Sequence, residues 1–232
     1  MKNSDSSTGQ TISIFPTTIF VTEFKPSVDL VNFFNSLQIN KRFHENKNNE
    51  NEVRKSYGYH TQDIRILKNK ECEELRKHIL ENALYYSNSI LGYDCVGLSD
   101  TLSWLSIKAP GEEHIPHTHP NSFISGVYYY EEVSQETPLV FKKTKNFVNT
   151  FEFIPPFKLE NAKDIYTATN EAHLLPQKGM VVFFPAHLEH YVPKNNTMGH
   201  RGGLAFNLMP VESLGDEMHL TAFKYKDTIN QF

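Results

Sequence analysis

The sequence predicts a mainly β fold, an antiparallel sandwich or barrel preceded along the chain by helices. Short runs of β-branched and aromatic residues, separated by Gly, Pro and Asn, fill about residues 99–210. That pattern is typical of an antiparallel sandwich or barrel. Two amphipathic helical patterns come before it, strands and helices do not alternate, and no GxGxxG or Walker sequence occurs. A doubly wound nucleotide-binding fold is therefore disfavoured.

The composition is that of one globular β domain. The chain has 232 residues, of which 39% are hydrophobic and 12% aromatic, enough to bury a sizeable core. The net charge of −4 gives no electrostatic signature for nucleic acid. No apolar run approaches the ~20 residues of a membrane span, and the polar start MKNSDSSTGQ does not resemble a secretory signal. We expect a cytoplasmic protein.

The first elements are a strand, a helix and a loop. Residues 11–24 are rich in β-branched and aromatic residues and predict a strand interrupted at Pro16. A short helix follows within 26–38, with Ser27 as its N-cap. Residues 40–56 are rich in Asn, Lys and Glu and almost free of apolar residues, which favours a surface loop.

The second helix has the clearest pattern. Residues 71–92 carry apolar side chains at spacings of three and four, begin with acidic residues and end near Gly92, where a glycine commonly terminates a helix. Cys72 and Cys95 are the two cysteines. They exclude a disulfide framework and a thiolate metal cluster, and we interpret both as small core residues.

The remaining chain contains the predicted strands. Their sequences are TLSWLSIKA, SFISGVYYYEE, TPLVFKK, AHLLP, GMVVFFP and GGLAFNLMP. We therefore expect a strand and helices in 1–98 that support the barrel, a catalytic β core in 99–210 and a C-terminal extension in 211–232, all within one structural domain. An insertion between Tyr130 and Leu175 is expected to shape the entrance of a pocket.

Histidines define the candidate site, because eleven occur against two cysteines. His117 and His119 are two residues apart, so on an extended strand they point to the same face, about 6.6 Å apart. Two imidazoles so placed can converge on one metal with bonds of about 2.0–2.1 Å. His114 lies in a different register and is not expected to bind it.

A third imidazole comes from a distant segment. In GMVVFFPAHLEHYVP, a buried strand runs into Pro185 and His190 follows a turn. With the HxH pair, His190 would complete a facial set of three ligands, which leaves coordination positions open for substrate and oxygen. His187 and His200 are interpreted as bystanders.

These sequence segments resemble those of the iron(II)/2-oxoglutarate oxygenases, in particular a small group common in marine bacteria and their phages. The resemblance covers IFPTTIF, SWLSIKAPG, HTHPNSFISGVYYY, PLVFKK, GMVVFFPAHLEHYV and RGGLAFN, most of the chain from residue 14 to residue 207. Two of these segments are also similar to the metal-binding segments of prolyl hydroxylases. The resemblance implies a double-stranded β-helix core, also described as jelly-roll or cupin-like, with the N-terminal helices packed on it.

The resemblance also implies iron ligands. His117 and His190 would be the proximal and distal ligands, and His119 stands where most of the superfamily has Asp or Glu. A neutral imidazole there leaves the site more positive by one unit, which we expect to weaken Fe(II) binding or to change reactivity. Arg201 matches the basic residue that pairs with the remote carboxylate of 2-oxoglutarate, a pairing suited to a guanidinium fork.

Further residues are assigned to the cofactors. By resemblance to prolyl hydroxylases, Ser125 and Tyr129 face the cofactor, and Tyr129 donates its hydroxyl to 2-oxoglutarate. Asn207 shares the strand parity of Arg201 and is expected to point inward near the metal. Trp104 and Asn121 are further candidates for the substrate pocket.

The resemblance implies a non-haem dioxygenase that uses Fe(II), 2-oxoglutarate and O2 and hydroxylates a substrate that the sequence does not identify. Two alternatives stay open. The spacings G-x5-H-x-H and G-x5-P also match cupins, although the usual glutamate after HxH is replaced by Ser122 and Phe123. That pattern favours a three-His dioxygenase without 2-oxoglutarate, and the other alternative is a degenerate, non-catalytic binding module. The sequence does not determine the oligomeric state, and a homodimer is one option.

Overall fold

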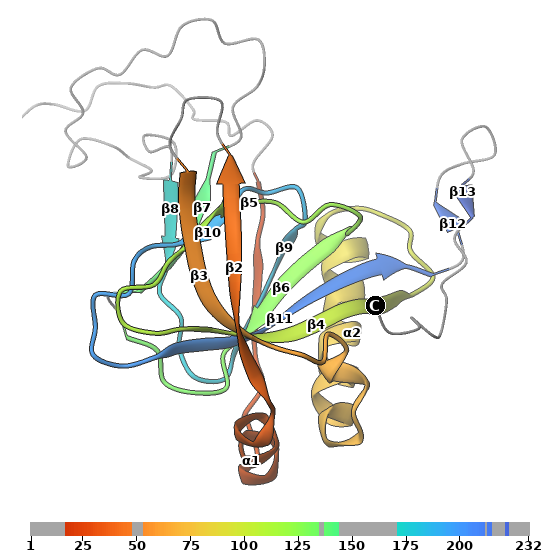
Figure 1. Cartoon of the computed structure of the whole chain (residues 1–232). Coiled ribbons are helices and arrows are strands. Elements are labelled where there is room, and N and C mark those ends of the chain that lie inside the picture. The colour runs from red at the N-terminus through yellow and green to blue at the C-terminus, as the bar shows by residue number, and fades with distance from the viewer. Residues whose placement is uncertain are drawn as a thin grey trace, which may run out of the picture.

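The computed structural model describes residues 17–47, 53–134, 137–143, 171–211, 213–214 and 221–222. Two antiparallel sheets face each other, and helices cover the larger one (Figure 1). The large sheet has seven strands in the order β1-β9-β6-β11-β4-β3-β2, and the small sheet has four in the order β5-β10-β7-β8. The predicted mainly β fold with a double-stranded β-helix core is confirmed.

The strand bounds follow the chain. The large sheet contains β1 (Phe20–Glu23), β2 (Ile39–Lys47), β3 (Val53–Thr61), β4 (Leu98–Lys108), β6 (Ile124–Tyr128), β9 (Met180–Pro185) and β11 (Arg201–Pro210). The small sheet contains β5 (His114–His117), β7 (Leu139–Lys142), β8 (Glu171–Leu174) and β10 (His190–Val192). A separate pair is formed by β12 (Ser213–Leu214) and β13 (Thr221–Ala222).

The loop predicted for residues 40–56 is wrong over most of its length. Residues of β2 and β3 pair in continuous antiparallel register from Ile39↔Thr61 to Lys47↔Val53. Backbone hydrogen bonds of a hairpin do not need apolar side chains, and charged residues are common on edge strands because they discourage further pairing. The polar composition of residues 40–56 therefore led to the prediction of a loop, whereas β2 and β3 form a hairpin at one edge of the large sheet.

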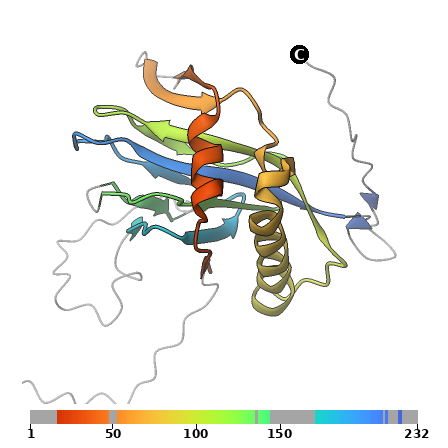
Figure 2. The same cartoon turned by 90° about the horizontal axis from the view of Figure 1, so that it is seen from below.

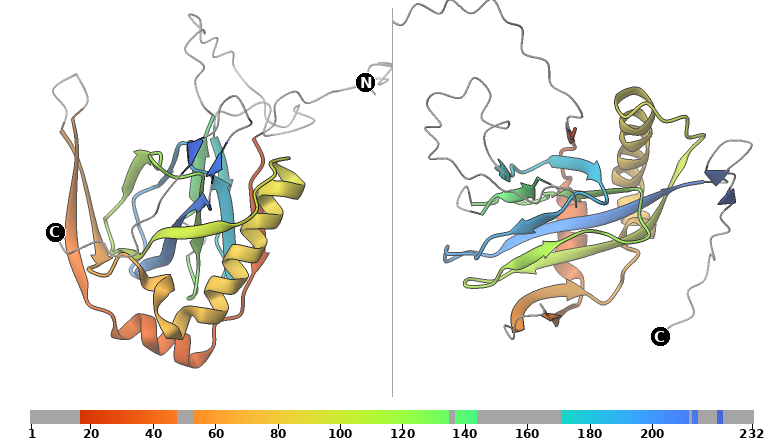
Figure 3. Two further views of the ribbon diagram at one scale, coloured as in Figure 1. Left: turned by 90° about the vertical axis from the view of Figure 1, so that its right-hand side faces the viewer. Right: turned by 90° about the horizontal axis from the view of Figure 1, so that it is seen from above.

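The helices lie on the outer face of the large sheet, away from the small one (Figures 2 and 3). The first, α1 (Val28–Ser36), begins at the predicted Ser27, whose Oγ accepts from the backbone N–H of Leu30 at 3.1 Å. The second, α2 (Glu73–Tyr85), continues as a π-helical turn η3 (Tyr86–Ile90), and Gly92 follows with φ 79°. Two short 3₁₀ turns, η1 (Ile66–Lys68) and η2 (Lys70–Cys72), precede α2.

Strand alternation separates two cores. On β9, Val181 and Phe183 face the helices, while Val182 and Phe184 face the small sheet. Because both faces of β9 are buried, the run MVVFF is apolar without alternation. The core under the helices is large and aromatic, and the core between the sheets is smaller. A pocket occupies part of the space between the sheets.

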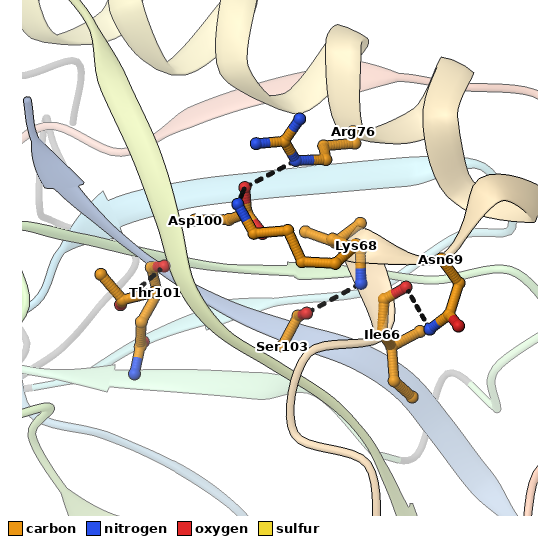
Figure 4. Close-up of polar contacts among 9 residues, drawn as sticks. Ile66, Lys68, Asn69, Arg76, Asp100, Thr101 and Ser103 are labelled. Atoms are coloured by element: carbon orange, nitrogen blue, oxygen red, sulfur yellow. Dashed lines mark hydrogen bonds and ion pairs between the residues drawn. The ribbon is translucent and has the colours of Figure 1, made fainter. Parts of the chain in front are cut away.

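An ion pair fixes the helical layer to the sheet. The side chain of Asp100 on β4 is only 2% exposed, and its Oδ1 lies 2.7 Å from Arg76 Nε of α2 and 3.2 Å from Lys68 Nζ of η1 (Figure 4). The two cations remain partly exposed, at 41% for Lys68 and 34% for Arg76. Their shared anion therefore orients α2 and η1 over β4 at little desolvation cost to the cations.

Other sequence predictions have mixed outcomes. The six predicted strands after residue 99 are confirmed as β4, β6, β7, β8, β9 and β11. The first strand is shorter than predicted and begins at Phe20, while residues 11–16 and most of the predicted insertion (135–136 and 144–170) lie outside the described residues. The domain bounds stay a prediction, although residues before 98 supply three strands of the large sheet. Among the described helices, none has the length and apolar character needed to cross a bilayer.

Candidate functional site

Strand pairing brings three histidines together between the sheets. His117 of β5 and His190 of β10 are directly paired in the small sheet. His119 follows two residues after His117, and its backbone N–H donates to the carbonyl of Ala186 at 2.9 Å. One ring nitrogen from each of the three imidazoles lies within 4.8 Å of the others. The predicted trio thus meets although 71 positions separate His119 from His190.

Backbone carbonyls fix the tautomers of two rings. His117 Nδ1 lies 2.9 Å from the carbonyl oxygen of Ile115, and His190 Nδ1 lies 2.9 Å from that of Leu188. A carbonyl oxygen only accepts, so each Nδ1 carries the proton and donates it. Each Nε2 then presents a lone pair, which is how metal-binding histidines are commonly held.

Asn207 contacts the third ring. The side chain of Asn207 acts on the His119 ring and favours its protonated form, as expected when an amide oxygen faces a ring N–H. The same Asn207 Oδ1 accepts from Ser125 Oγ at 2.9 Å. His119 Nε2 faces His190 Nε2 at 3.2 Å.

Burial keeps two of these imidazoles neutral. Desolvation, followed by the charge of His117, lowers the pKa of His119 to about 4 and the pKa of His190 to about 3. At neutral pH both rings offer lone pairs. Two nitrogens on one metal with bonds of about 2.1 Å, at right angles, would lie about 3.0 Å apart, close to the 3.2 Å found here. The donor set therefore fits a divalent metal.

The trio lines a small pocket between the two sheets. Arg201, which starts β11 and is only 6% exposed, lines the same pocket. Its Nη2 donates to the hydroxyl of Tyr129 at 3.0 Å, and its Nε donates to the carbonyl of Thr137 at 3.1 Å. The pocket wall is completed by aromatic and small residues, including Trp104, Val127, Phe184 and Gly203.

Gly203 leaves room in this wall. A β-carbon at this position would lie 2.8 Å from Val127 and 3.5 Å from the ring of Tyr129. Any larger residue would push these side chains or enter the pocket between the histidines and Arg201. The second glycine of RGGLAFN, Gly203, is thus explained by close packing at the site.

The structure places the predicted site residues as follows. Ser125 and Asn207 lie beside His119, whereas Tyr129 lies beside Arg201. The ring of His114 stacks on that of His117, with centroids 4.2 Å apart, and lines the pocket without joining the trio.

Of the other residues named from the sequence, one lines the pocket and three do not. Trp104 lines the pocket, as predicted, and both His187 and His200 are exposed. Asn121 is a correction, because it does not line the pocket. Its φ of 57° places it in a left-handed turn, a conformation that Asn tolerates well.

Sequence reasoning missed two residues. Thr137 contributes a backbone carbonyl, for which no side-chain signal exists. Lys108 is directly opposite Arg201 in the β4–β11 register and is 1% exposed. The sequence contained a hint of this position, because residues 104 and 108 point to the same face of an extended strand. A lysine at the end of a strand is usually exposed, however, so Lys108 was not expected to be buried.

Residues 102–207 match a family model described as "Putative 2OG-Fe(II) oxygenase". A comparison with curated proteins finds no match.

The solved structures that share this fold include two with TM-scores of 0.53 and 0.52. The non-haem alpha-ketoglutarate-dependent epimerase SnoN from nogalamycin biosynthesis has a TM-score of 0.53 and 10% identity, over 84% of this chain and 80% of that chain. HygX from Streptomyces hygroscopicus, with nickel, 2-oxoglutarate and hygromycin B bound, has a TM-score of 0.52 and 12% identity, over 84% and 83%. The predicted resemblance to the 2OG-Fe(II) oxygenases is therefore confirmed, by sequence over residues 102–207 and by fold over most of the chain.

Proposed function

We propose that this chain is a non-haem Fe(II), 2-oxoglutarate-dependent dioxygenase that hydroxylates a substrate while 2-oxoglutarate is decarboxylated to succinate. One observation carries the proposal: three imidazole nitrogens and a buried guanidinium line the same pocket. The family match and the shared fold support it. Iron and 2-oxoglutarate are the cofactors that this family description implies.

His117, His119 and His190 would hold the iron through Nε2. When bound, iron supplies the reaction with dioxygen that a protein side chain alone cannot perform. The chain contributes positioning, because the carbonyls behind His117 and His190 fix the rings before a metal arrives. With three neutral ligands, the site keeps the full charge of the cation.

Arg201 would bind the remote carboxylate of 2-oxoglutarate. Two of its nitrogens are engaged by Tyr129 and Thr137, which orients the guanidinium and leaves Nη1 for an anion. Burial raises the pKa of Tyr129 despite the nearby Arg201 charge. Its hydroxyl therefore keeps a proton, which it can donate to the same carboxylate while it accepts from Arg201.

Ser125 and Asn207 would act on the metal site through His119. The chain of hydrogen bonds runs from Ser125 Oγ to Asn207 Oδ1, and Asn207 contacts the His119 ring. This arrangement gives His119 an orienting partner comparable with the carbonyls that hold the other two rings. Their contacts favour a role in positioning this ligand over direct contact with 2-oxoglutarate.

The pocket wall would exclude water from the reacting groups. Val127, Leu139 and Phe184 supply apolar surface to the pocket that the trio and Arg201 also line. A dry pocket strengthens the attraction between Arg201 and a carboxylate and limits side reactions. The wall of Trp104 and His114 is the place where a substrate would reach the site, beside the trio.

The test uses purified protein reconstituted with Fe(II) under anaerobic conditions. Addition of 2-oxoglutarate should produce a visible metal-to-ligand absorption band, and admission of air should produce succinate in the presence of a substrate or slowly without one. Arg201→Ala should abolish the band at 2-oxoglutarate concentrations that saturate the native protein. Absence of both the band and succinate in the native protein would refute the proposal.

The three-His set specifically favours one alternative, a cupin-type dioxygenase that needs no 2-oxoglutarate. The same experiment separates the two functions, because Arg201→Ala would then leave oxygen consumption with the true substrate intact. Metal analysis addresses the remaining alternative. Sub-stoichiometric metal after reconstitution would indicate a non-catalytic module.

A further inference from the structure

A bulge in β5 brings His114 onto the same side as His117. The two residues are three positions apart, so a regular extended strand would turn their side chains to opposite faces. From His117 to His114, β5 takes three steps along the ladder, whereas the paired segment of β10 takes only two. One extra residue of this kind is a β-bulge, which re-aims side chains and is common next to active sites.

Pro116 lies inside this bulge. Proline has no backbone N–H to donate to a ladder, so within sheets it is confined to edge strands, strand starts and bulges. The carbonyl of Ile115, the other residue of the bulge, accepts from His117 Nδ1 at 2.9 Å. The bulge therefore acts on His117 twice, through this carbonyl and through the ring of His114.

The His114 ring lies almost flat on the His117 ring. Their centroids are 4.2 Å apart and their planes differ by 20°, whereas the rings of the other two candidate ligands meet His117 at 50° and 51°. His114 in turn contacts His60 of β3, which is 5% exposed and meets it edge-on, with centroids 6.3 Å apart at 69°. A buried side chain behind His114 thus limits the movement of the stacked ring.

The stacked ring restricts a motion that the hydrogen bond allows. One bond through Nδ1 leaves the His117 imidazole free to tilt about the line of that bond. A parallel ring against its face opposes the tilt, so His117 keeps its aim at the point where the three imidazoles converge. This precision matters, because a metal site needs its ligands within about 10–20° of the productive orientation.

The same contact should strengthen when a metal binds. A divalent cation withdraws electron density from the ring that binds it, and an aromatic face attracts positive charge. A contact that is stronger in the metal-bound form raises metal affinity, whereas a contact equal in both forms stabilises only the fold. The stack therefore predicts an effect on metal binding that is separate from any effect on stability.

We propose that His114 is a positioning residue of the metal site, which holds the His117 imidazole in the orientation that a metal requires. This inference rests on the metal-binding part of the proposed function. The aromatic face of His114 carries the effect, and its ring nitrogens do not. An aromatic side chain without nitrogen should therefore replace His114, and a non-aromatic side chain should not.

The experiment measures Mn(II) dissociation constants by electron paramagnetic resonance on the native protein, His114→Phe and His114→Leu. Phenylalanine keeps a ring, and leucine keeps only apolar bulk. His187→Leu is the matched control, because His187 also stands three residues before a candidate ligand but is exposed. The absorption spectra of the Co(II)-loaded forms report ligand geometry, and urea unfolding of the metal-free forms reports stability.

His114→Leu should weaken Mn(II) binding by about 3- to 10-fold, the range expected for the loss of an aromatic pair. It should also shift the Co(II) absorption bands. His114→Phe should stay within about twofold of the native affinity, because the ring contact is retained, and should keep the native bands. His187→Leu should likewise match the native protein in both measurements.

Equal loss of affinity in His114→Phe and His114→Leu would overturn the inference, because a ring nitrogen of His114 would then be the group that matters. Native Mn(II) affinity in His114→Leu would overturn it as well, and a lower free energy of unfolding in that variant would assign His114 to the fold alone. In both cases the native protein still binds Mn(II), so the proposed function stands. If the native protein binds no Mn(II), the proposed function fails and the inference fails with it. Should His114→Leu not fold, His114→Gln, which is polar and has no ring, is measured in its place.

Discussion

His119 Nε2 and His190 Nε2 lie 3.2 Å apart with their rings almost parallel, at an interplanar angle of 4°. His190 Nδ1 donates to the carbonyl of Leu188, so His190 Nε2 carries a lone pair that faces His119. In the tautomer with the His119 proton on Nδ1, two lone pairs face each other at this distance, and they repel each other unless a cation lies between them. This pair therefore gives the strongest geometric reason to expect a metal, and the following predictions begin from it.

Removal of one ligand should remove the metal. His190→Ala is expected to lower bound Fe(II) or Mn(II) from one equivalent to below about 0.1, because two neutral imidazoles hold such ions weakly. Elemental analysis after desalting measures the content. His187→Ala is the matched control, since His187 is exposed and lies three residues before His190. Equal loss in both variants would contradict the assignment of His190.

The position of His119 should accept a carboxylate. His119→Asp supplies an anionic oxygen ligand, so metal affinity should stay within about tenfold of the native value or increase. His119→Ala should lower the affinity by at least that factor. Titration with Mn(II), followed by calorimetry or electron paramagnetic resonance, measures both variants. If His119→Asp loses metal as completely as His119→Ala, this position does not bind the metal.

Asn207 should matter for the metal without touching it. Asn207→Ala removes the partner of His119 and is expected to weaken metal binding by about 10- to 100-fold, the usual effect of losing a group that orients a ligand. The matched control is Thr101→Val, which removes a hydroxyl that donates to the backbone carbonyl of residue 207 at 3.2 Å. A metal affinity equal to that of the native protein would exclude this role for Asn207.

The metal-free protein should lose stability between about pH 6.5 and pH 5. The pKa values of His119 and His190 are about 4 and about 3 because both rings are buried, whereas an unfolded histidine titrates near 6.5. In that window the unfolded chain binds more protons, so the free energy of unfolding falls as the pH falls. Urea unfolding at a series of pH values measures the slope.

The double variant His119→Gln, His190→Gln tests the origin of that slope. Glutamine is polar but does not titrate, so the variant should show a flatter dependence between pH 6.5 and pH 5. A slope equal to that of the native protein would assign the effect to other groups. As the pH falls, the metal-loaded protein should release its metal at a higher pH than the pH at which it unfolds, because protons compete with the metal for the same nitrogens.

Loss of Asp100 should destabilise the fold without altering the metal site. Asp100→Asn removes the shared anion of Arg76 and Lys68, and we expect a loss of about 2 kcal/mol, because both cations are partly exposed and can be hydrated. Chemical denaturation measures this loss. Glu81→Gln removes an exposed pair with Lys77 and should change stability by less than about 0.5 kcal/mol. If Asp100→Asn and Glu81→Gln lower the free energy of unfolding by similar amounts, Asp100 does not hold the helices on the sheet.

The sequence by itself determined the local features. The cap at Ser27, the helix that ends near Gly92 and the apolar strand of β9 each follow from residues adjacent in the chain. The HxH pair belongs to the same class, because strand alternation places His117 and His119 on one face. The position of His190 after the buried strand and turn made it the candidate third ligand, and the family resemblance added Arg201.

Only the tertiary structure decided which distant residues meet. Direct pairing of His117 with His190, and of Lys108 with Arg201, depends on the registers of β5–β10 and β4–β11. Register is set by the packing of whole strands, and a shift of one residue would reverse every side chain. The polar β2–β3 hairpin was missed for the related reason that backbone pairing carries no side-chain signature. The sequence thus supplied the candidate metal-binding histidines, and the register of the sheets decided which strands pair beside them and which residue lies opposite Arg201.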